Sequence, residues 1–366
     1  MIQGITVLGD LFRPDGRGQP GGADRATTWL FDAIKRQLHL ACGRPIDVIT
    51  IDRMPPLRAW LDAERKPPAA HRHWASCYEH LPESTEIHTH LIPRLRQRFC
   101  IGYELPPNLR RLLTALELPH IDLRLHPVRF LDDLLFAARA SHPATQSALL
   151  AMATAESEVV ITAGLREAMC HYISAATVPP NTLIVVGQRP LDSSQIVDGR
   201  FYDAVPHAAE IHAICARHAA VLLKPHPLEP EHSLLAVAAG APNVRGVVGD
   251  NLYRLLSLPQ VAAVLTVNSS IACEAPYFGQ RVHTLAPLPL RVAWRGATDQ
   301  PGLYASLDDR VLTPDFWRCV LAPHMPVTAP DAVRLPAKPN RLRIALDSFW
   351  NFQEIDSDRV PRRAGA

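Results

Sequence analysis

Several features that would place this chain in a specialised class of protein are missing from its sequence. The 366 residues include only seven cysteines, which are scattered, odd in number and never arranged as CxxC. This usage excludes a disulfide framework and a structural zinc site, and it predicts a protein of a reducing compartment.

Signals for membranes and nucleic acids are also lacking. No apolar run approaches the roughly 20 residues that a membrane-spanning helix needs, and the N-terminal stretch MIQGITVLGDLF lacks the basic and apolar regions of a signal peptide. The net charge is only +2, so we expect no nucleic-acid partner. We therefore predict a cytoplasmic protein whose membrane association, if it has any, is peripheral, at the inner face of the cytoplasmic membrane.

The sequence has no GxGxxG fingerprint, no P-loop and no internal repeat. A loop rich in glycine and proline, Arg13 to Gly22, matches neither nucleotide motif. We interpret it as a flexible loop at the edge of a cleft.

What the sequence does contain is an alternation of strands and helices, which is typical of parallel α/β sheets. A strand at Ile2–Leu8, a helix at Asp24–Leu40 with Asp24 as its N-cap, and a strand at Asp47–Asp52 open the chain. The first half continues with strands at Phe99–Tyr103 and Ile121–Leu125 and helices at Asn108–Leu116, Phe130–Ala140 and Thr145–Ser174, whereas the His-rich residues 66 to 95 are interpreted as irregular.

A second strand–helix series follows the linker Val178-Pro179-Pro180. Its strands are predicted at Leu183–Val186, Val221–Leu223, Val244–Val248, Val261–Val267 and Val282–Leu285, and a last helix at Leu342–Phe352. The length fits two domains. We predict two Rossmann-like domains, residues 1–176 and 177–330, and a C-terminal extension, residues 331–366, whose helix packs back on the first domain.

Polar residues gather at the ends of three predicted strands of the second half. Gln188, Asp192 and Ser193 follow the first, Lys224 and His226 the second, and Asn268, Ser269 and Ser270 the third. Ligands of open α/β sheets bind outside the carboxyl ends of the strands. Serines that open a helix can hold a phosphate or simply cap the helix. A histidine fixed between two prolines suits a phosphate or a base edge. We therefore expect one crevice there.

Three carboxylates could act in such a crevice. Asp192 is a candidate nucleophile or base, with an ordinary Asp-Ser-Ser turn as the alternative. Glu104 and Asp10 follow strands of the first domain and would face the cleft from the opposite side.

Two HxH pairs, His71/His73 and His88/His90, raise the alternative of a metal-dependent hydrolase. The sequence around them is a poor barrel strand, and the chain lacks the matching series of eight strand–helix units. We expect no metal cofactor.

The order of GQRPLDSS, KPHP and NSS before a helix, together with GYELPP at Gly102–Pro107, resembles bacterial capsule-polysaccharide biosynthesis proteins, above all the retaining β-Kdo glycosyltransferases. The resemblance covers roughly residues 100 to 285. It implies a GT-B fold, CMP-Kdo or a similar nucleotide sugar as donor, and a glycan or glycolipid acceptor such as lipopolysaccharide or O-antigen.

The resemblance also implies roles for individual residues. Asp192 would be the nucleophile that forms a covalent sugar adduct, and Glu104 the acid or base near the acceptor. His226, Ser269 and Ser270 would hold the cytidine monophosphate, with Gln188, Lys224 and Asn268 in the same donor site. Three alternatives stay open: an inverting sialyltransferase-like enzyme with Glu104 or Asp10 as base, the metal hydrolase, and a non-catalytic protein that binds CMP-sugars.

Overall fold

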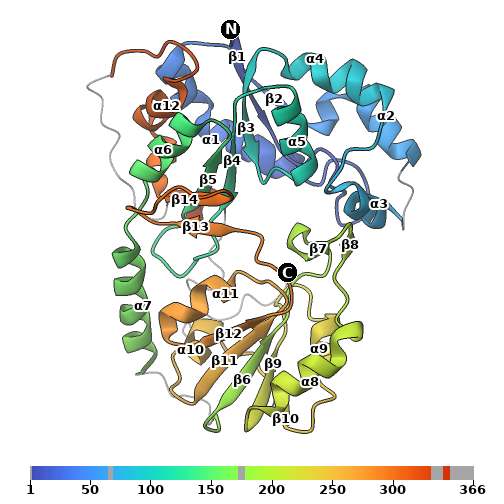
Figure 1. The fold of residues 1–366 in the computed structure, drawn as a ribbon, viewed down its shortest axis with the longest axis vertical. Coiled ribbons are helices and arrows are strands. Elements are labelled where there is room, and N and C mark those ends of the chain that lie inside the picture. The colour runs from blue at the N-terminus through green and yellow to red at the C-terminus, as the bar shows by residue number, and fades with distance from the viewer. Residues whose placement is uncertain (1, 65–68, 172–177, 331–340, 347–366) are drawn as a thin grey trace.

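The computed structural model describes residues 2–64, 69–171, 178–330 and 341–346, and it contains two large β-sheets. Figure 1 shows the first sheet, which carries β1 to β5, above the second, which carries β6 and β9 to β12. Helices cover both sheets. The mixed α/β architecture that the sequence predicts is therefore confirmed.

The first sheet has seven strands in the order β13-β14-β5-β4-β3-β1-β2. All of them run in one direction except β5, which is antiparallel to both of its neighbours. The strands are β1 Gly4–Leu8, β2 Ile46–Ile49, β3 Arg98–Tyr103, β4 His120–Leu125, β5 Phe136–Ala140, β13 Arg291–Ala293 and β14 Leu303–Leu307.

The second sheet is fully parallel, with the order β10-β9-β6-β11-β12. Its strands are β6 Thr182–Val186, β9 Ala220–Lys224, β10 Val244–Val247, β11 Val261–Thr266 and β12 Arg281–Thr284. All five predicted strands are confirmed. A small hairpin, β7 Ile196–Val197 and β8 Arg200–Phe201, lies outside both sheets.

Buried apolar side chains cover both faces of each sheet, as parallel sheets require. In the first sheet, α1, α6 and α12 pack on one face, and α2, α4 and α5 pack on the other. In the second sheet, α7, α10 and α11 cover one face, and α8 and α9 cover the other. The helices are α1 Asp24–Cys42, α2 Pro55–Glu64, α3 Ala70–Cys77, α4 Ile92–Leu95, α5 Pro107–Ala115, α6 Pro143–Ala151, α7 Glu156–His171, α8 Ala208–Ala216, α9 Ser233–Ala238, α10 Leu252–Leu256, α11 Ile271–Glu274, α12 Pro314–Leu321 and α13 Arg341–Leu346.

Three local predictions are wrong. The helix expected at Phe130–Ala140 is a loop followed by β5, which pairs with both β4 and β14. The irregular stretch expected at 66–95 contains α3, whose Ala70, Trp74 and Cys77 are buried with helical spacing. Asp24 does not cap α1, because the N-cap is Ala23 and the Asp24 carboxylate instead accepts the backbone N–H groups of Ile51 and Asp52.

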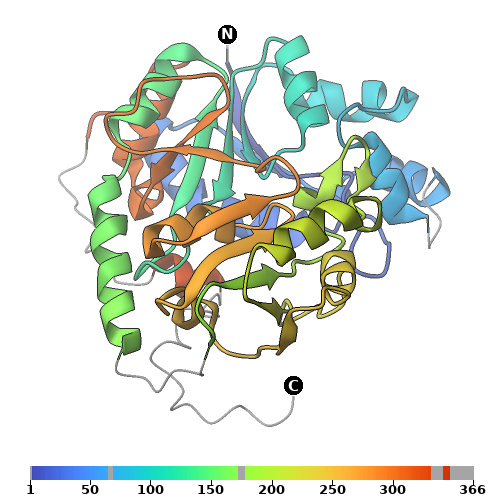
Figure 2. The same cartoon turned by 60° about the horizontal axis from the view of Figure 1, so that its bottom comes forward.

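The chain crosses between the two sheets more than once. Residues 291–307, which were predicted as part of the second domain, form β13 and β14 of the first sheet. In the opposite direction, α7 packs its Val159, Ala163 and Cys170 into the core of the second sheet. The helix α7 therefore flanks the second sheet along one side of the molecule, in Figure 1 and again in the turned view of Figure 2.

The helix α13 contacts the loop between β4 and β5. Both oxygens of Asp133 accept backbone N–H groups of α13, from Leu342 and Arg343. The buried Arg343 in turn donates to the carbonyl oxygens of Leu131 and Asp132. The rest of the helix expected at Leu342–Phe352, and most of the extension 331–366, lie outside the described residues.

Across the described ranges, no helix taken singly has both the length and the hydropathy of a membrane span. The helices α6 and α7 reach that threshold only as a pair, across a bend of 44°.

The buried Asp122 on β4 ties the turn after β3 to the rest of the first sheet. One carboxylate oxygen accepts the backbone N–H of Leu105 at 2.8 Å, and the other accepts Arg124 Nε at 2.8 Å and the Tyr304 hydroxyl at 2.7 Å. Burial raises the pKa of Tyr304 to about 12, and the charge of Asp122 adds to the rise.

We predict that Asp122→Ala lowers the free energy of unfolding by about 3–5 kcal/mol, because it leaves Arg124 buried without its carboxylate. The matched control is Asp32→Ala, which removes a carboxylate paired with Lys35 at the surface and should cost less than about 1 kcal/mol. Urea denaturation measures both. Equal losses for the two variants would contradict this role of Asp122.

Candidate functional site

The strand order of each sheet defines one switch point at which a ligand crevice is expected. In the first sheet this point lies between β1 and β3, and in the second between β6 and β11. Asp10 and Glu104 follow β1 and β3, whereas Gln188 and Asn268 follow β6 and β11. The candidate residues of both halves therefore lie at the positions where α/β sheets bind ligands.

The loops at these two switch points meet at Arg13. Its guanidinium lies 3.7 Å from the carboxylate of Asp192 and 5.4 Å from the centre of the Trp74 ring. Arg13 also lines a small pocket together with Asp10, Tyr103, Glu104 and Ser193. Arg13 thus lines one pocket with the candidate residues Asp10, Glu104 and Ser193, and it contacts a fourth candidate, Asp192.

The loop that carries Arg13 has a defined backbone. Gly22 N–H donates to the carbonyl oxygen of Arg13 at 2.9 Å, Asp15 N–H donates to Gln19 at 2.7 Å, and Pro14 and Pro20 form a β-bridge. These contacts fix the base of the loop, so that Arg13 is held at the edge of the pocket.

Asp10 is buried, and its carboxylate accepts both a backbone and a side-chain hydrogen bond. They come from the backbone N–H of Phe12 at 3.0 Å and from Trp74 Nε1 at 2.8 Å. Asp10 thereby orients the Trp74 ring against which Arg13 lies.

Glu104 lies in a left-handed backbone conformation with φ of 53°, which costs a non-glycine residue about 1–3 kcal/mol. The strained turn is held by the hydrogen bond from its own N–H to Leu123 at 2.8 Å and by the bond from Leu105 N–H to Asp122. Burial raises the pKa of the Glu104 carboxyl and the charge of Asp192 adds to the rise, against the opposing charges of Arg13, Arg124 and Arg129. Glu104 lines the same pocket as Arg13, which in turn contacts Asp192.

The two carboxylate oxygens of Asp192 have different partners. Oδ1 accepts the backbone N–H of Ser194 at 3.0 Å and so caps the short 3₁₀ turn Ser193–Gln195, as the Asp-Ser-Ser alternative predicts. Oδ2 faces Arg13. Ser193 lines the same small pocket as Arg13, Tyr103 and Glu104 of the first half. The turn is thus fixed from both halves of the chain.

A buried network of amide side chains lies beneath this turn. Asn268 Oδ1 accepts from Gln188 Nε2 and from Gln195 Nε2, each at 3.0 Å, and Asn268 Nδ2 donates to the carbonyl oxygen of Ser194 at 2.6 Å. Gln188 Oε1 accepts Thr266 Oγ1 and the backbone N–H of Asn268. His232 contacts Gln195 at 3.1 Å. Gln188 and Asn268, predicted as donor-binding residues, are engaged here in holding the Asp192 turn to two strand ends.

His226 lies on the loop that follows β9. The pKa of its imidazole is lowered by burial and by the charge of Arg189, while the charges of Glu229 and Asp192 oppose the shift. Its Nδ1 accepts the backbone N–H of Leu228 at 3.2 Å. The neighbouring Lys224 donates to the carbonyl oxygen of Gly249 at 3.2 Å.

Ser269 and Ser270 are half-buried and precede α11, which is a single turn of α-helix that continues as a 3₁₀ turn. The Ser270 side chain makes no capping hydrogen bond. Within the described part of the chain, neither hydroxyl has a hydrogen-bond partner. The two hydroxyls themselves, rather than a long helix dipole, are what this position offers to a ligand.

The two HxH pairs do not lie on strands, where both imidazoles of a pair would point to the same side. His71 and His73 lie on α3, and His88 and His90 lie in a π-helical turn, Ile87–Leu91. Side chains two positions apart on a helix point in different directions. Among the residues whose positions are given, no three His, Cys, Asp or Glu side chains gather as metal ligands would. The metal-hydrolase alternative therefore loses its structural basis.

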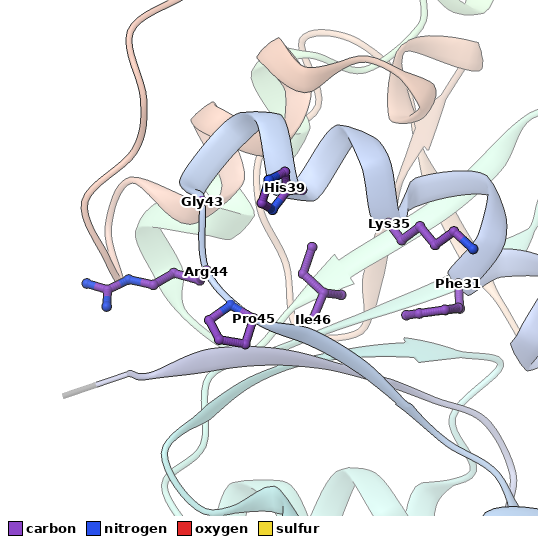
Figure 3. Close-up of a pocket in the computed structure, with 7 residues that line it drawn as sticks. All are labelled: Phe31, Lys35, His39, Gly43, Arg44, Pro45 and Ile46. Atoms are coloured by element: carbon purple, nitrogen blue, oxygen red, sulfur yellow. The ribbon is translucent and has the colours of Figure 1, made fainter.

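A second pocket lies between α1 and the amino end of β2 in the first sheet (Figure 3). It is lined by Phe31, Lys35 and His39 of α1 and by residues 43–46, which lead into the amino end of β2. Its lining contains no carboxylate, and it lies away from both switch points.

Some residues that lie at the candidate site were not predicted from the sequence. Arg13, Trp74 and Tyr78 come from stretches interpreted as a flexible loop or as irregular, and Gln195 and His232 carried no motif. The signal for Gln195 is its place one turn after Asp192. For Trp74 it is the helical spacing of the buried residues of α3.

Comparisons with known proteins give little further guidance. No family model matches the chain, and no curated protein matches it. Among solved structures, it is similar to KpsC of Thermosulfurimonas dismutans, a beta Kdo 2,7 transferase, with 15% identity over 55% of this chain and 69% of that one, at a TM-score of 0.30. A likeness at this level does not establish a family.

We predict that Asn268→Ala loosens the turn that carries Asp192 and lowers the free energy of unfolding by at least about 2 kcal/mol, because it leaves buried amides of Gln188 and Gln195 without an acceptor. The control is Ser269→Ala, which should change stability by less than about 0.5 kcal/mol. Hydrogen exchange at the amides of Ser194 and Gln195 should speed up only in Asn268→Ala. Unchanged exchange there would show that the network does not hold the turn.

Proposed function

We propose that the protein is a glycosyltransferase of GT-B type, which transfers Kdo or a related acidic sugar from a CMP-activated donor to a glycan acceptor with retention. One observation carries the proposal: Glu104 lines the same small pocket as Arg13, and Arg13 pairs with Asp192, so carboxylates from switch-point loops of separate sheets share one cation. Pairs of carboxyl groups in unequal environments are the usual machinery for chemistry at an anomeric carbon.

The two carboxylates would act in succession. In the first step Asp192 Oδ2 attacks the anomeric carbon, and the bond from that carbon to the phosphate oxygen of CMP breaks with the electron pair leaving on CMP. His226 and the hydroxyls of Ser269 and Ser270 would bind the departing phosphate. In the second step Glu104 accepts the proton of the acceptor hydroxyl, whose oxygen attacks the anomeric carbon and displaces Asp192.

This mechanism suits the environments of the two groups. The contact of Asp192 with Arg13 and with the N–H of Ser194 orients the carboxylate and leaves Oδ2 on the side of the pocket. Glu104 has a raised pKa, and a general base works best when its pKa approaches the pH of the reaction.

The protein incubated with CMP-Kdo should show, by intact mass, the addition of one sugar per chain, and Asp192→Ala should show none. Asp203→Asn is the matched control, since it alters an exposed carboxylate further along the same segment, and it should form the adduct as the unaltered protein does. An adduct that persists in Asp192→Ala would overturn the assignment of the nucleophile.

Glu104 gives a second prediction, because a base must be ionised to work. Turnover should fall as the pH drops through the raised pKa of Glu104, so the acidic limb lies above the ordinary range of a glutamate. Glu104→Gln should slow turnover about 10²–10⁴-fold and remove this limb. Because the first step survives, the variant should release one equivalent of CMP in a burst and accumulate the adduct. A normal steady-state rate in Glu104→Gln would contradict the role.

The inverting alternative also has an observation in its favour, since Asp192 Oδ1 caps a turn as a structural residue would. In that case Glu104 would be the base for direct displacement. Asp10 suits the role less well, because its two oxygens already accept hydrogen bonds from Phe12 and Trp74. The stereochemistry of the product, determined by NMR, separates the two mechanisms.

A further inference from the structure

His232, the residue directly before α9, has hydrogen-bond partners at both of its ring nitrogens. Nδ1 accepts the backbone N–H of Leu234 at 3.1 Å and so caps α9, and Nε2 lies 3.1 Å from Oε1 of Gln195. A backbone N–H can only donate, so Nδ1 carries no proton and the proton of the neutral imidazole is on Nε2. His232 therefore donates a hydrogen bond to the side chain of Gln195.

This tautomer sets the direction of the amide network beneath the Asp192 turn. Because Oε1 of Gln195 faces the imidazole of His232, its Nε2 faces Asn268, whose Oδ1 accepts it at 3.0 Å. At the far end, Nδ2 of Asn268 donates to the carbonyl oxygen of Ser194 at 2.6 Å. A carbonyl oxygen can only accept, so the amide of Asn268 also has a fixed orientation.

A reversed amide anywhere in this chain would leave a buried polar group without a partner. The exposed fractions of His232, Gln195 and Asn268 are only 7%, 0% and 3%, so a lost hydrogen bond there carries the full cost of desolvation. The three side chains thus have one consistent arrangement of donors and acceptors. His232 fixes one end of it, and the backbone of Ser194 fixes the other.

The start of α9 is itself held in place. Ser233 Oγ accepts the backbone N–H of Ala204 at 3.1 Å, and Leu234 and Leu235 are buried in the core of the second sheet. Burial lowers the pKa of His232, so the imidazole is neutral at neutral pH, as its use as both acceptor and donor requires. His232 is therefore a fixed point from which the network is oriented.

The network ends at the turn that holds Asp192. The backbone N–H of Ser194 donates to Oδ1 of Asp192 at 3.0 Å, and the carbonyl oxygen of Ser194 accepts Nδ2 of Asn268. The backbone N–H of Gln195 closes the turn by donating to the carbonyl oxygen of Asp192 at 2.9 Å. The orientation of the Asp192 carboxylate thus depends on groups that the imidazole of His232 orders.

We propose that His232 is a positioning residue for Asp192, and that its Nε2–H, acting through Gln195 and Asn268, fixes the turn that aims the carboxylate. The consequence for turnover rests on the proposed function, in which Asp192 attacks the anomeric carbon. A displaced nucleophile slows the chemical step more than it weakens binding of the donor. Loss of the Nε2–H should therefore lower kcat and leave KM nearly unchanged.

Two substitutions separate the roles of the two ring nitrogens. His232→Asn places an amide oxygen where Nδ1 caps α9, and asparagine is a favoured N-cap, but the side chain is too short to reach Gln195. His232→Gln places an amide N–H donor where Nε2 lies, and glutamine is not a favoured cap. His232→Asn should therefore be the more stable variant and the slower enzyme, whereas a residue that only caps α9 would make activity follow stability.

The rate of adduct formation from CMP-Kdo, the steady-state constants and hydrogen exchange at the amides of Ser194 and Gln195 measure the effect. His232→Asn should slow adduct formation about ten- to hundredfold and speed up the exchange, and His232→Gln should restore most of the rate. The control is His212→Asn, because His212 contacts the carbonyl oxygen of Val237 near the other end of α9. It should change none of these quantities.

The tautomer gives a readout that needs no substrate, since NMR of the imidazole nitrogens should show His232 protonated at Nε2. A proton on Nδ1, a normal rate in His232→Asn, or a rate in His232→Gln as low as in His232→Asn would overturn the inference, while adduct formation by the unaltered protein left the proposed function standing. If the unaltered protein forms no adduct and consumes no CMP-Kdo, the proposed function fails and the effect on turnover with it. Unchanged exchange at Ser194 and Gln195 in His232→Asn would then also contradict the hold of His232 on the turn.

Discussion

The ion pair between Arg13 and Asp192 is the contact on which the candidate site depends, because it joins loops at the switch points of two separate sheets. Without a cation between them, the charges of Glu104 and Asp192 would repel each other in a half-buried pocket. Arg13 offsets that repulsion and lies against Trp74, which Asp10 orients. A site of this kind keeps its geometry only while the two halves of the chain stay in contact.

The path of the chain maintains that contact. Strands β13 and β14 come after the strands of the second sheet in the sequence, but they belong to the first sheet. Conversely, α7 and residues 128–135 come before the second sheet in the sequence and pack on it. The hairpin β7–β8 adds a further contact, because its Phe201 ring lies 5.9 Å from that of Trp74. The two packed sheets therefore each include segments from both sides of the boundary at residues 176 and 177.

The sequence predicts the strands of the second sheet well because each is a short apolar run between turn residues, a pattern that the burial of both faces imposes. It fails at β5, Phe136–Ala140, whose alanines favour a helix by propensity. Pairing with β4 and β14 overrides that preference, and β14 lies more than 160 residues further along the chain. Local sequence carries no trace of such a partner.

Contacts between segments that are distant in the sequence also explain why some candidate site residues could be predicted and others could not. Glu104 and His226 come just after β3 and β9, and Asp192 lies in the turn after β6, so their place at a sheet edge can be read from periodicity. Arg13 and Trp74 reach the site through tertiary contacts of a loop and a helix, which no motif marks. Gln188 and Asn268 follow the ends of β6 and β11, and the structure engages their amides in supporting the Asp192 turn.

A crystal structure with CMP bound tests the central claim most directly. We expect the phosphate of CMP to lie between His226 and the hydroxyls of Ser269 and Ser270, with Asp192 and Glu104 facing the position of the sugar. CMP bound away from these residues, for example in the pocket between α1 and β2, would contradict the proposed donor site.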